Sequence, residues 1–329
     1  MKTNVTIIVV PRERFNSSKQ ALESIYENTD LPFSLTYIDG GSPPQVKKYL
    51  EQYSSKKGFK LIRYESYLYP NQARNIGLQK VNSKYVVFID NDVVVSPGWL
   101  SQLIKCSEDT GASVVGPLTC IGQPIHQVIH SGGMELSITE NIKGEKSIQQ
   151  KVWFATDLVS NISHSLERYK CDCVEFHCVL IRTETFRKIG FLDEKLLNTR
   201  EHIDFCLMVS QSGGSIYCEP SVMATYITDF PFTLSDLSFF IVRWNDSWEL
   251  ASLQHFRQKW NLADDDYFQY RYKNLGNIRR KTFLKPLIKL LTLGKNFPKY
   301  EKFLHMFLMP LERKISGIIY QNILKQFKS

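Results

Sequence analysis

The stretch Tyr85-Val86-Val87-Phe88-Ile89-Asp90-Asn91-Asp92 decides the fold. A short apolar run, typical of a buried strand, ends in two carboxylates that are separated by one residue. In open α/β sheets, ligands bind at the carboxyl edge of the strands, where Asp90 and Asp92 are expected to lie. Two carboxylates at that edge suit Mg²⁺ or Mn²⁺, which prefer oxygen ligands and commonly carry a phosphate-bearing substrate.

The acidic pair is a weak signal by itself, because a chain of this composition contains about one Asp-x-Asp by chance. A second pair, Asp264 and Asp266, lies in an acidic cluster that follows no apolar run. The neighbouring elements therefore decide whether Asp90 and Asp92 form a site.

Length and composition are those of a folded, water-soluble protein. The 329 residues are enough for one large domain, or for a domain with an appendage. Hydrophobic residues make up 43% and charged residues 22%, which is ordinary for a soluble chain. No apolar run approaches the ~18 residues of a membrane span, and the run Val5–Val10 is too short for a signal peptide. We therefore expect a cytoplasmic protein.

The seven cysteines support the same compartment. Their odd number and scattered positions favour reduced thiols over a disulfide framework. Cys171, Cys173 and Cys178 lie close together, but their spacing is not that of a common zinc site. Buried thiols are the favoured interpretation, and a metal site is the alternative.

The positive charge of the chain is concentrated at its C-terminal end. The net charge is +8, yet residues 271–329 carry 14 Lys and Arg against 2 Asp and Glu. The first 270 residues carry 27 basic and 31 acidic residues, so they are slightly acidic. The basic character therefore belongs to the tail and not to the presumed catalytic part.

Strands and helices alternate through about the first 105 residues. Apolar β-branched runs predict strands over 5–10, 31–38, 59–64 and 85–89, and helical spacing predicts helices from Ser17 or Ser18, Gln45, Asn71 and Pro97. This alternation predicts a doubly wound, mostly parallel sheet. Neither Gly-x-Gly-x-x-Gly nor a P-loop motif is present, which argues against a dinucleotide-binding oxidoreductase and a P-loop enzyme. A metal at Asp90 and Asp92 is the available means of holding phosphates.

Two further residues in this half are candidates for nucleotide binding. Asp39 ends a predicted strand and precedes Gly40-Gly41, where it can accept a hydrogen bond from a base or ribose. The alternative is that Asp39 only organises the turn. Arg74 lies in the first turns of a predicted helix and can point toward the nucleotide, or it can lie on a solvated face.

The second half is less regular. We expect strands over 112–116, 174–182, 215–219 and 222–227, a helix over 183–189 and another from Thr199, with a long loop or lid over 122–150. Glu201 and Asp204 share one helix face at i,i+3, with His202 beside them. The acidic residues can take part in chemistry, or they can only stabilise the first turn of the helix.

The order of these motifs is similar to that of a known family. It includes Pro11, Tyr37-Ile38-Asp39-Gly40-Gly41-Ser42, Ala73-Arg74-Asn75-Ile76-Gly77, Phe88-Ile89-Asp90-Asn91-Asp92, Pro97-Gly98-Trp99-Leu100, Gly190-Phe191-Leu192-Asp193-Glu194 and Glu201-His202-Ile203-Asp204. Over about residues 4–230 the chain resembles the family 2 glycosyltransferases, which have the GT-A fold. The resemblance implies a Rossmann-like sheet flanked by helices.

The resemblance also implies roles for particular residues. The nucleotide-binding set would be Pro11, Glu13, Asp39, Arg74 and Asp90, with Asp39 on the base. Asp90 would face ribose or metal, and Asp92 would hold Mg²⁺ or Mn²⁺ on the diphosphate of the donor. In the family, a second pair of acidic residues, near the end of the domain, supplies the general base.

The chain departs from the family pattern at two positions. His202 stands where the family usually has the Asp that acts as base. An imidazole, with a pKa near ~6.5, can take a proton from a sugar hydroxyl at neutral pH, and Glu201 or Asp204 would orient it. Alternatively, a carboxylate is the base or transfer is weakened. Tyr226 stands where many relatives have a metal-binding His, so one protein ligand is missing or is supplied differently.

The expected function is inverting transfer of a sugar from a nucleoside-diphosphate sugar, a UDP-sugar, to a hydroxyl of a glycan or lipid-linked acceptor, as in polysaccharide biosynthesis. Two alternatives remain open. One is a non-catalytic GT-A-like protein that binds a glycan or partner. The other is a sugar nucleotidyltransferase, although its Gly-rich, Arg-containing loop after the first strand is missing here.

We expect a catalytic domain over 1–230, with a nucleotide-sugar half (1–120) and an acceptor half (121–230), and a helical extension over 231–329. Aromatic residues at helical spacing between Phe239 and Trp260 predict packing onto the catalytic domain, with contact to a sugar as the alternative. Residues 279–329 are basic and amphipathic, which favours peripheral binding to an anionic membrane. A helical bundle or an oligomer interface is the alternative, and no nucleic-acid module is recognisable.

Overall fold

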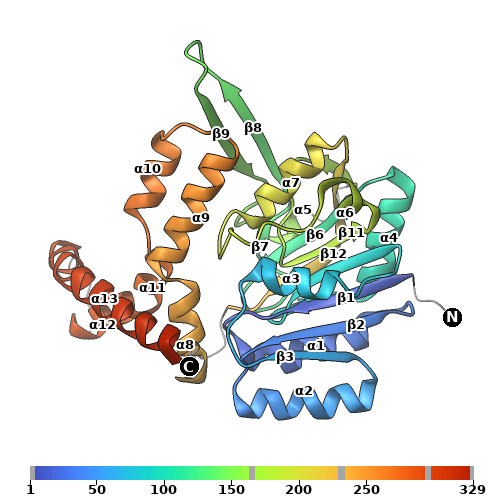
Figure 1. Cartoon of the computed structure of the whole chain (residues 1–329), viewed down its shortest axis with the longest axis horizontal. Helices are drawn as coiled ribbons and strands as arrows, with labels where there is room; N and C mark the ends of the chain where they lie inside the picture. Colours follow the sequence, from blue (N-terminus) through green and yellow to red (C-terminus); the bar gives the residue numbers. More distant parts are fainter. Residues whose placement is uncertain (1–3, 163–166, 229–233, 293–297, 327–329) are drawn as a thin grey trace.

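The computed structural model describes residues 4–162, 167–228, 234–292 and 298–326. Within these residues, ten strands form one sheet along the path β10-β12-β6-β11-β4-β1-β2-β3, with β5 beside β12 and β7 beside β6 (Figure 1). The sheet is mostly parallel with helices on its faces, as predicted.

The first half of the chain follows the predicted alternation. Its elements are β1 (Val5–Val10), α1 (Ser18–Asn28), β2 (Ser34–Gly40), α2 (Pro44–Lys57), β3 (Lys60–Tyr64), α3 (Pro70–Leu78), β4 (Tyr85–Asp90), β5 (Val93–Val95) and α4 (Trp99–Thr110). Strands β3, β2, β1 and β4 are neighbours and parallel. The predicted doubly wound arrangement is therefore confirmed for this half.

Burial on both faces of the sheet explains the continuous apolar runs of β1 and β4. Every residue of both strands is buried. Val5, Ile7 and Val9 pack into one core cluster, whereas Ile8 and Val10 pack into the other. A strand covered on both sides has no solvated face, so its sequence shows no polar alternation.

The strand register brings the candidate residues to one edge. In the β1–β4 pairing Val10 is aligned with Asp90, and Val9 is aligned with Tyr37 of β2. The loop after β1, the end of β2 and the end of β4 therefore meet at the carboxyl edge of the sheet, where ligands bind in such folds.

The second half completes the sheet with a parallel β6–β12 pair and several antiparallel pairings. Its elements are β6 (Val114–Ile121), β7 (Ile129–Ser131), α5 (Val159–Ile162), β10 (Tyr169–Cys171), β11 (Cys178–Arg182), α6 (Glu184–Ile189), α7 (Glu201–Gln211) and β12 (Ile216–Tyr226). Strand β11 lies antiparallel between β4 and β6. The two strands predicted over 215–219 and 222–227 are one strand, because Pro220 lies within a register shift between Glu219 and Met223.

The expected loop over 122–150 is wrong. It contains β7 and most of a hairpin formed by β8 (Met134–Glu140) and β9 (Lys146–Val152), which projects from the body (Figure 1). Most of β8 is exposed, but Met134, Leu136 and Ile138 alternate with polar residues, a strand pattern that the expectation of a loop overlooked. Near the tip of the hairpin, the amide of Ala263 donates to the Lys146 carbonyl at 2.7 Å.

At two of the predicted helix starts, the polar side chains do not cap the helix. A 3₁₀ turn over Phe15–Ser17 precedes α1, and neither Ser17 nor Ser18 caps the helix with its side chain. Asn71 lies inside α3, which is capped by Tyr69. The Asn71 side chain instead donates to the carbonyl of Asp193 at 2.9 Å. It therefore ties α3 to the loop before α7.

The C-terminal extension is helical. It comprises α8 (Leu234–Arg243), α9 (Asp246–Lys259), α10 (Asp266–Lys273), α11 (Asn277–Arg279), a π-helical turn (Arg280–Leu284), α12 (Lys285–Leu291) and α13 (Pro298–Gln326). The boundary expected at residue 230 lies outside the described residues. Phe239, Trp248 and Phe256 are buried, and Phe239 stacks on Phe15 and Tyr67 of the α/β part.

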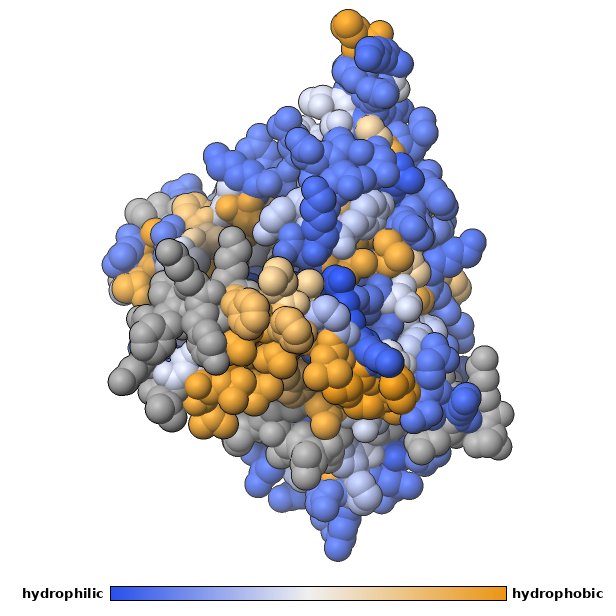
Figure 2. Space-filling model, turned by 90° about the vertical axis from the view of Figure 1, so that its left-hand side faces the viewer, coloured by the Kyte–Doolittle hydropathy of each residue, from blue (hydrophilic) through white to orange (hydrophobic). Residues whose placement is uncertain are grey.

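The outer helices leave an apolar surface. Figure 2 shows apolar residues gathered on the side of the molecule where α8, α12 and α13 lie. In the part of the chain that the structure describes, every helix is too short or too polar to cross a bilayer.

All seven cysteines are buried, and they form no disulfide with one another.

Candidate active site

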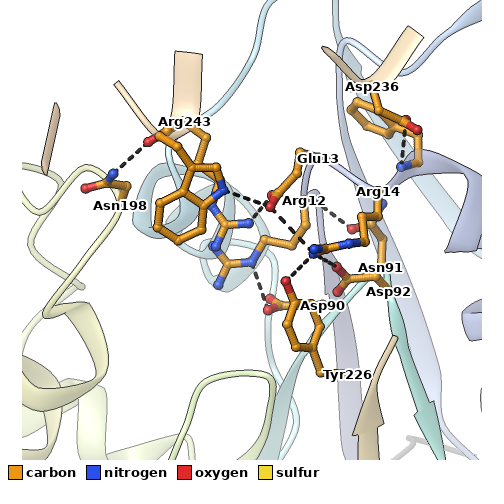
Figure 3. A network of polar contacts seen from close by, with 12 residues as sticks. Arg12, Glu13, Arg14, Asp90, Asn91, Asp92, Asn198, Tyr226, Asp236 and Arg243 are labelled. Atoms are coloured by element: carbon orange, nitrogen blue, oxygen red, sulfur yellow. Dashed lines mark hydrogen bonds and ion pairs between the residues drawn. The ribbon is translucent and has the colours of Figure 1, made fainter. Parts of the chain in front are cut away.

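The acidic pair is buried at the end of β4. Asp90 is the last residue of that strand, Asp92 precedes β5, and both side chains are fully buried. Asn91 fixes the turn between them, because its Oδ1 accepts the Arg12 amide at 2.7 Å and its Nδ2 donates to Ser18 at 2.9 Å. The loop after β1 is therefore locked against the acidic pair (Figure 3).

The free oxygens of the pair fit a cation. Both carboxylate oxygens of Asp92 and Oδ1 of Asp90 are buried and accept no hydrogen bond from the described residues. Burial and the neighbouring Asp90 raise the pKa of Asp92 to about 7. Burial would also raise the pKa of Asp90, but Arg12 and His177 hold it below its ordinary value. Buried carboxylate oxygens that accept no hydrogen bond are costly, and a divalent cation would satisfy them.

The described residues contain no complete metal site. No group of three or more His, Cys, Asp or Glu side chains in these ranges is arranged to hold an ion. Asp90 and Asp92 can supply two carboxylates, so the remaining ligands would have to come from a substrate or from water.

Two buried arginines face the acidic pair. Arg12 Nε lies 2.8 Å from Asp90 Oδ2, and Arg74 Nη2 lies 3.6 Å from Asp90 Oδ1. Glu201 Oε1 lies 3.9 Å from Arg12 and 4.0 Å from Arg74. Several of their nitrogens donate no hydrogen bond within the described residues, namely Nη1 of Arg12 and Nε and Nη2 of Arg74. Arg74 is thus not on a solvated face, and the unused donors fit an anion.

Glu13 connects the β1 loop to the C-terminal extension. The Arg243 guanidinium pairs with the Glu13 carboxylate, and Trp244 Nε1 donates to Glu13 Oε1 at 2.9 Å (Figure 3). Burial opposes ionisation of Glu13, but Arg243 and Arg14 lower its pKa to about 2. The end of α8 therefore forms one wall of the site, which the sequence analysis did not assign to it.

Asp39 is held in a tight turn. Its Oδ1 accepts the Ser42 amide at 3.0 Å, its Oδ2 accepts the Ser42 hydroxyl at 2.8 Å, and Arg63 pairs with the same Oδ2. Asp39 is fully buried. The turn-organising alternative is thus realised, and contact with a base stays a prediction.

His202 has a partner that the sequence analysis missed. Its Nε2 lies 3.7 Å from Glu175 Oε1. Burial lowers the pKa of His202, while the Glu175 carboxylate acts in the opposite direction. Asp204 instead accepts from Lys259 Nζ and from Trp260 Nε1, each at 2.8 Å, and Glu201 faces Arg12 and Arg74.

Tyr226 ends β12 beside the acidic pair. The β12–β5 pairing aligns Tyr226 with Val93, the residue after Asp92. Its hydroxyl accepts a hydrogen bond from Arg14, and its ring stacks on His177 with centroids 4.6 Å apart. The position where many relatives carry a metal-binding His therefore holds a phenol bonded to an arginine.

Some of the missed residues left a signal in the sequence. Arg12 and Arg14 flank Glu13 directly after an apolar strand, so charged residues stand where a strand reaches the ligand edge. Glu175 and His177 interrupt an otherwise apolar run at alternate positions. Arg243 gave no such signal, because it reaches the site from the extension.

Comparison with known proteins agrees with this geometry. Residues 6–168 match the profile described as glycosyl transferase family 2. The chain is 23% identical over 159 residues to a pre-mycofactocin glycosyltransferase of Mycobacterium tuberculosis, which covers 48% of this chain and 30% of that protein. It is 34% identical over 92 residues to an uncharacterized glycosyltransferase of Rickettsia felis, covering 27% of this chain and 15% of that protein. The chain thus spans less than a third of these relatives.

A solved structure supports the fold. The crystal structure of GalNAc-T7 with UDP, GalNAc and Mn²⁺ superposes with a TM-score of 0.53 at 17% identity, over 85% of this chain and 57% of that chain. The mostly parallel sheet and the matched profile lead to one conclusion. Residues 6–168, about half of the chain, belong to the family 2 glycosyltransferases, and the chain has the GT-A fold.

Proposed function

We propose that the chain transfers a sugar, with inversion, from a UDP-sugar to a hydroxyl of a glycan or lipid-linked acceptor. The observation that carries the proposal is the set of unused buried groups at one sheet edge. Oxygens of Asp90 and Asp92 face a cation site, and nitrogens of Arg12 and Arg74 face an anion site. A metal-bound diphosphate has both charges. The GalNAc-T7 structure, which holds UDP, GalNAc and Mn²⁺, supports this choice of donor.

Asp90 and Asp92 would hold Mg²⁺ or Mn²⁺. When bound, such an ion stabilises the charge that develops on a departing diphosphate. Arg12 and Arg74 would donate hydrogen bonds to the phosphate oxygens through the buried nitrogens that donate to none of the described residues. Asp39, in its fixed turn, would accept from the base.

His202 would be the general base. Burial lowers its pKa, so the imidazole is neutral and able to take a proton from the acceptor hydroxyl at physiological pH. The Glu175 carboxylate, 3.7 Å from Nε2, would balance the imidazolium charge that forms. Glu201 faces the two arginines, and its proposed contribution is to hold them beside the diphosphate.

Calorimetry with the whole chain tests the donor. UDP should bind with Mn²⁺ and at least about tenfold more weakly with EDTA. Asp92→Asn should remove this metal effect, whereas Asp264→Asn, in the exposed second Asp-x-Asp, should leave it intact. A panel of UDP-sugars would then be assayed for turnover. UDP binding that is equal with and without metal would contradict the proposed site.

A non-catalytic binding protein is the second candidate. The observations that favour it are His202 in place of the usual carboxylate and Tyr226 bonded to Arg14. Such a protein would bind UDP but turn over none of the donor sugars in the panel. Any sugar transfer or donor hydrolysis that His202→Gln abolishes would exclude it.

The extension is proposed to bind an anionic membrane surface. Large apolar side chains are exposed on α12 and α13, namely Leu287, Leu290, Leu291, Phe303, Met306, Phe307, Leu311, Ile315 and Ile318 (Figure 2). Phe303, Phe307, Leu311 and Ile315 follow one another at i,i+4, so they form a row along α13. An apolar hollow of about 310 Å³ lies between this row, α8 and α12.

Exposed lysines accompany the apolar surface. Lys285 and Lys289 form their own i,i+4 row on α12, and Lys281 and Lys314 are also exposed. Apolar residues that can enter the headgroup layer, next to lysines that attract anionic lipids, are typical of peripheral membrane helices.

Vesicle flotation tests the membrane proposal. The chain should float with phosphatidylglycerol-containing vesicles at low salt and not with phosphatidylcholine vesicles. Phe307→Ser with Leu311→Ser, or Lys285→Glu with Lys289→Glu, should reduce binding several-fold. Ile142→Ser, at the exposed tip of the β8–β9 hairpin, is the control. Equal flotation of all variants would contradict the proposal.

A further inference from the structure

Arg14 lies at the metal end of the site. Its Nη1 donates to the Tyr226 hydroxyl and lies 3.6 Å from Glu13 Oε1 and 3.7 Å from Asp92 Oδ2 (Figure 3). Its guanidinium carbon is 4.9 Å from the centre of the Tyr226 ring. Because arginine keeps its proton in proteins, this charge is permanent. The chain itself therefore places a cation beside Asp92.

The sheet holds Tyr226, and through it Arg14, in this place. The amide of Ile227 donates to the Asp92 carbonyl at 2.9 Å, and Tyr226 is aligned with Val93. The His177 ring stacks on Tyr226 at an interplanar angle of 15°. The hydroxyl is thus fixed by main-chain pairing and ring packing, so Arg14 has a defined position.

Charges in the site balance without a metal ion. Four carboxylates each lie within 4.0 Å of a guanidinium: Glu13, Asp90, Asp92 and Glu201, beside Arg12, Arg14, Arg74 and Arg243. Within the described residues, the ion pair of Asp92 is made with Arg14. A free divalent ion at Asp92 would gain little net attraction and would lie close to the Arg14 charge, in a buried site where such repulsion is strong.

We propose that Arg14 is an internal counter-cation that makes divalent-ion binding at Asp90 and Asp92 depend on the nucleotide. The inference rests on the proposed function, because it takes the donor's diphosphate as the group that makes the net charge of the site negative. A diphosphate adds negative charge next to Arg14 and supplies oxygen ligands that the acidic pair does not provide. Metal and nucleotide then bind together, and the ion leaves when the diphosphate leaves.

Electron paramagnetic resonance of Mn²⁺ measures this directly on the whole chain, without turnover. For the wild type, UDP should raise Mn²⁺ affinity about 100-fold, and binding without UDP should be weak. Arg14→Gln should bind Mn²⁺ about tenfold or more tightly than wild type in the absence of UDP. Arg14→Lys, which keeps the charge, should resemble wild type. Arg168→Gln, which removes a guanidinium from the carboxylates of Asp109 and Glu219, is the matched control and should leave Mn²⁺ affinity unchanged.

The outcomes separate this inference from the proposed function. Arg14→Gln with no gain in Mn²⁺ affinity without UDP would overturn the inference. Wild type that binds no Mn²⁺ even with UDP would overturn the metal part of the proposed function instead. Circular dichroism checks that Arg14→Gln folds. If it does not, Tyr226→Phe replaces it, because loss of the hydroxyl frees Arg14 and should give a smaller gain in the same direction. No gain there would equally overturn the inference.

Discussion

His202 Nε2 on α7 lies 3.7 Å from Oε1 of Glu175, which comes from the loop before β11. Burial lowers the pKa of His202, whereas the Glu175 carboxylate opposes the shift. Replacing Glu175 by Gln removes the opposing charge, so the pKa of His202 should fall further. The acid limb of the pH–kcat profile should therefore move to lower pH, while kcat at the plateau falls because the imidazolium loses its partner.

The controls for this prediction use the same pH profiles. His202→Gln should reduce kcat by about 10²–10⁴-fold and remove the limb altogether. Glu175→Asp should restore part of the plateau rate, because it keeps the negative charge. An acid limb that stays in place or moves upward in Glu175→Gln would show that this carboxylate does not act on the base.

Asp39 should contribute to nucleotide affinity through the base. Its carboxylate is already oriented by Ser42 and Arg63, so Asp39→Asn keeps the shape but weakens acceptance from a base N–H. We expect UDP affinity to fall about tenfold or more, with little effect on inorganic pyrophosphate. Glu65→Gln, which removes an exposed partner of the same Arg63, is the matched control and should leave UDP affinity unchanged. A parallel loss for pyrophosphate would mean that the whole site is distorted.

The parts of the fold that could be predicted are those with a single strong signal. Strands β1 and β4 are buried on both faces, and their apolar runs end where polar residues begin. Asp90 and Asp92 could be placed at the ligand edge for the same reason. The β8–β9 hairpin could have been predicted, because Met134, Leu136 and Ile138 alternate with polar residues, which is the period of a half-buried strand. Strand β12 was divided because Pro220 normally ends a strand, yet here it lies in a register shift.

The unpredicted part of the site depends on contacts between distant segments. Arg243 contacts Glu13, which is 230 residues away in the sequence. Glu175 contacts His202 from the loop that precedes β11. Such pairs follow from the packing of whole elements, which no local spacing encodes. The proposal that Glu201 or Asp204 orients His202 relied on neighbouring positions in one helix. Helix α7 in fact directs Asp204 to Lys259 and Trp260 of the extension.

Asp204 should therefore matter more for stability than for catalysis. In Asp204→Asn, the side chain can still accept the hydrogen bond from Trp260, but it is a weaker acceptor for Lys259. The extension therefore loses part of its attachment to α7. We expect the free energy of unfolding to fall by about 1–3 kcal/mol. The kcat of the folded protein should stay within about twofold of wild type, measured below the melting transition. If kcat fell as much as in His202→Gln and the melting temperature did not change, Asp204 would take part in catalysis instead.

Two helical glycines provide a paired test of the packing between α3 and the sheet. A Cβ built on Gly77 would lie 2.6 Å from Cγ2 of Ile8, a buried residue of β1, whereas one on Gly317 of α13 meets nothing within 4 Å. Replacing Gly by Ala in a helix normally stabilises it by about 1 kcal/mol, which is the expected result for Gly317→Ala. For Gly77→Ala, overpacking costs about 1–3 kcal/mol and should outweigh that gain, because β1 is covered on both faces and cannot retreat.

Chemical unfolding of the two variants should give midpoints that move in opposite directions, with unchanged dependence on denaturant concentration. Because α3 carries Arg74, Gly77→Ala should also weaken UDP binding at temperatures where the protein is still folded. Gly317→Ala, on the outer helix, should leave UDP affinity unchanged. If both variants were stabilised by the same amount, α3 would have room to move away from β1. The packing of α3 on β1 would then not be what holds Arg74 against Asp90.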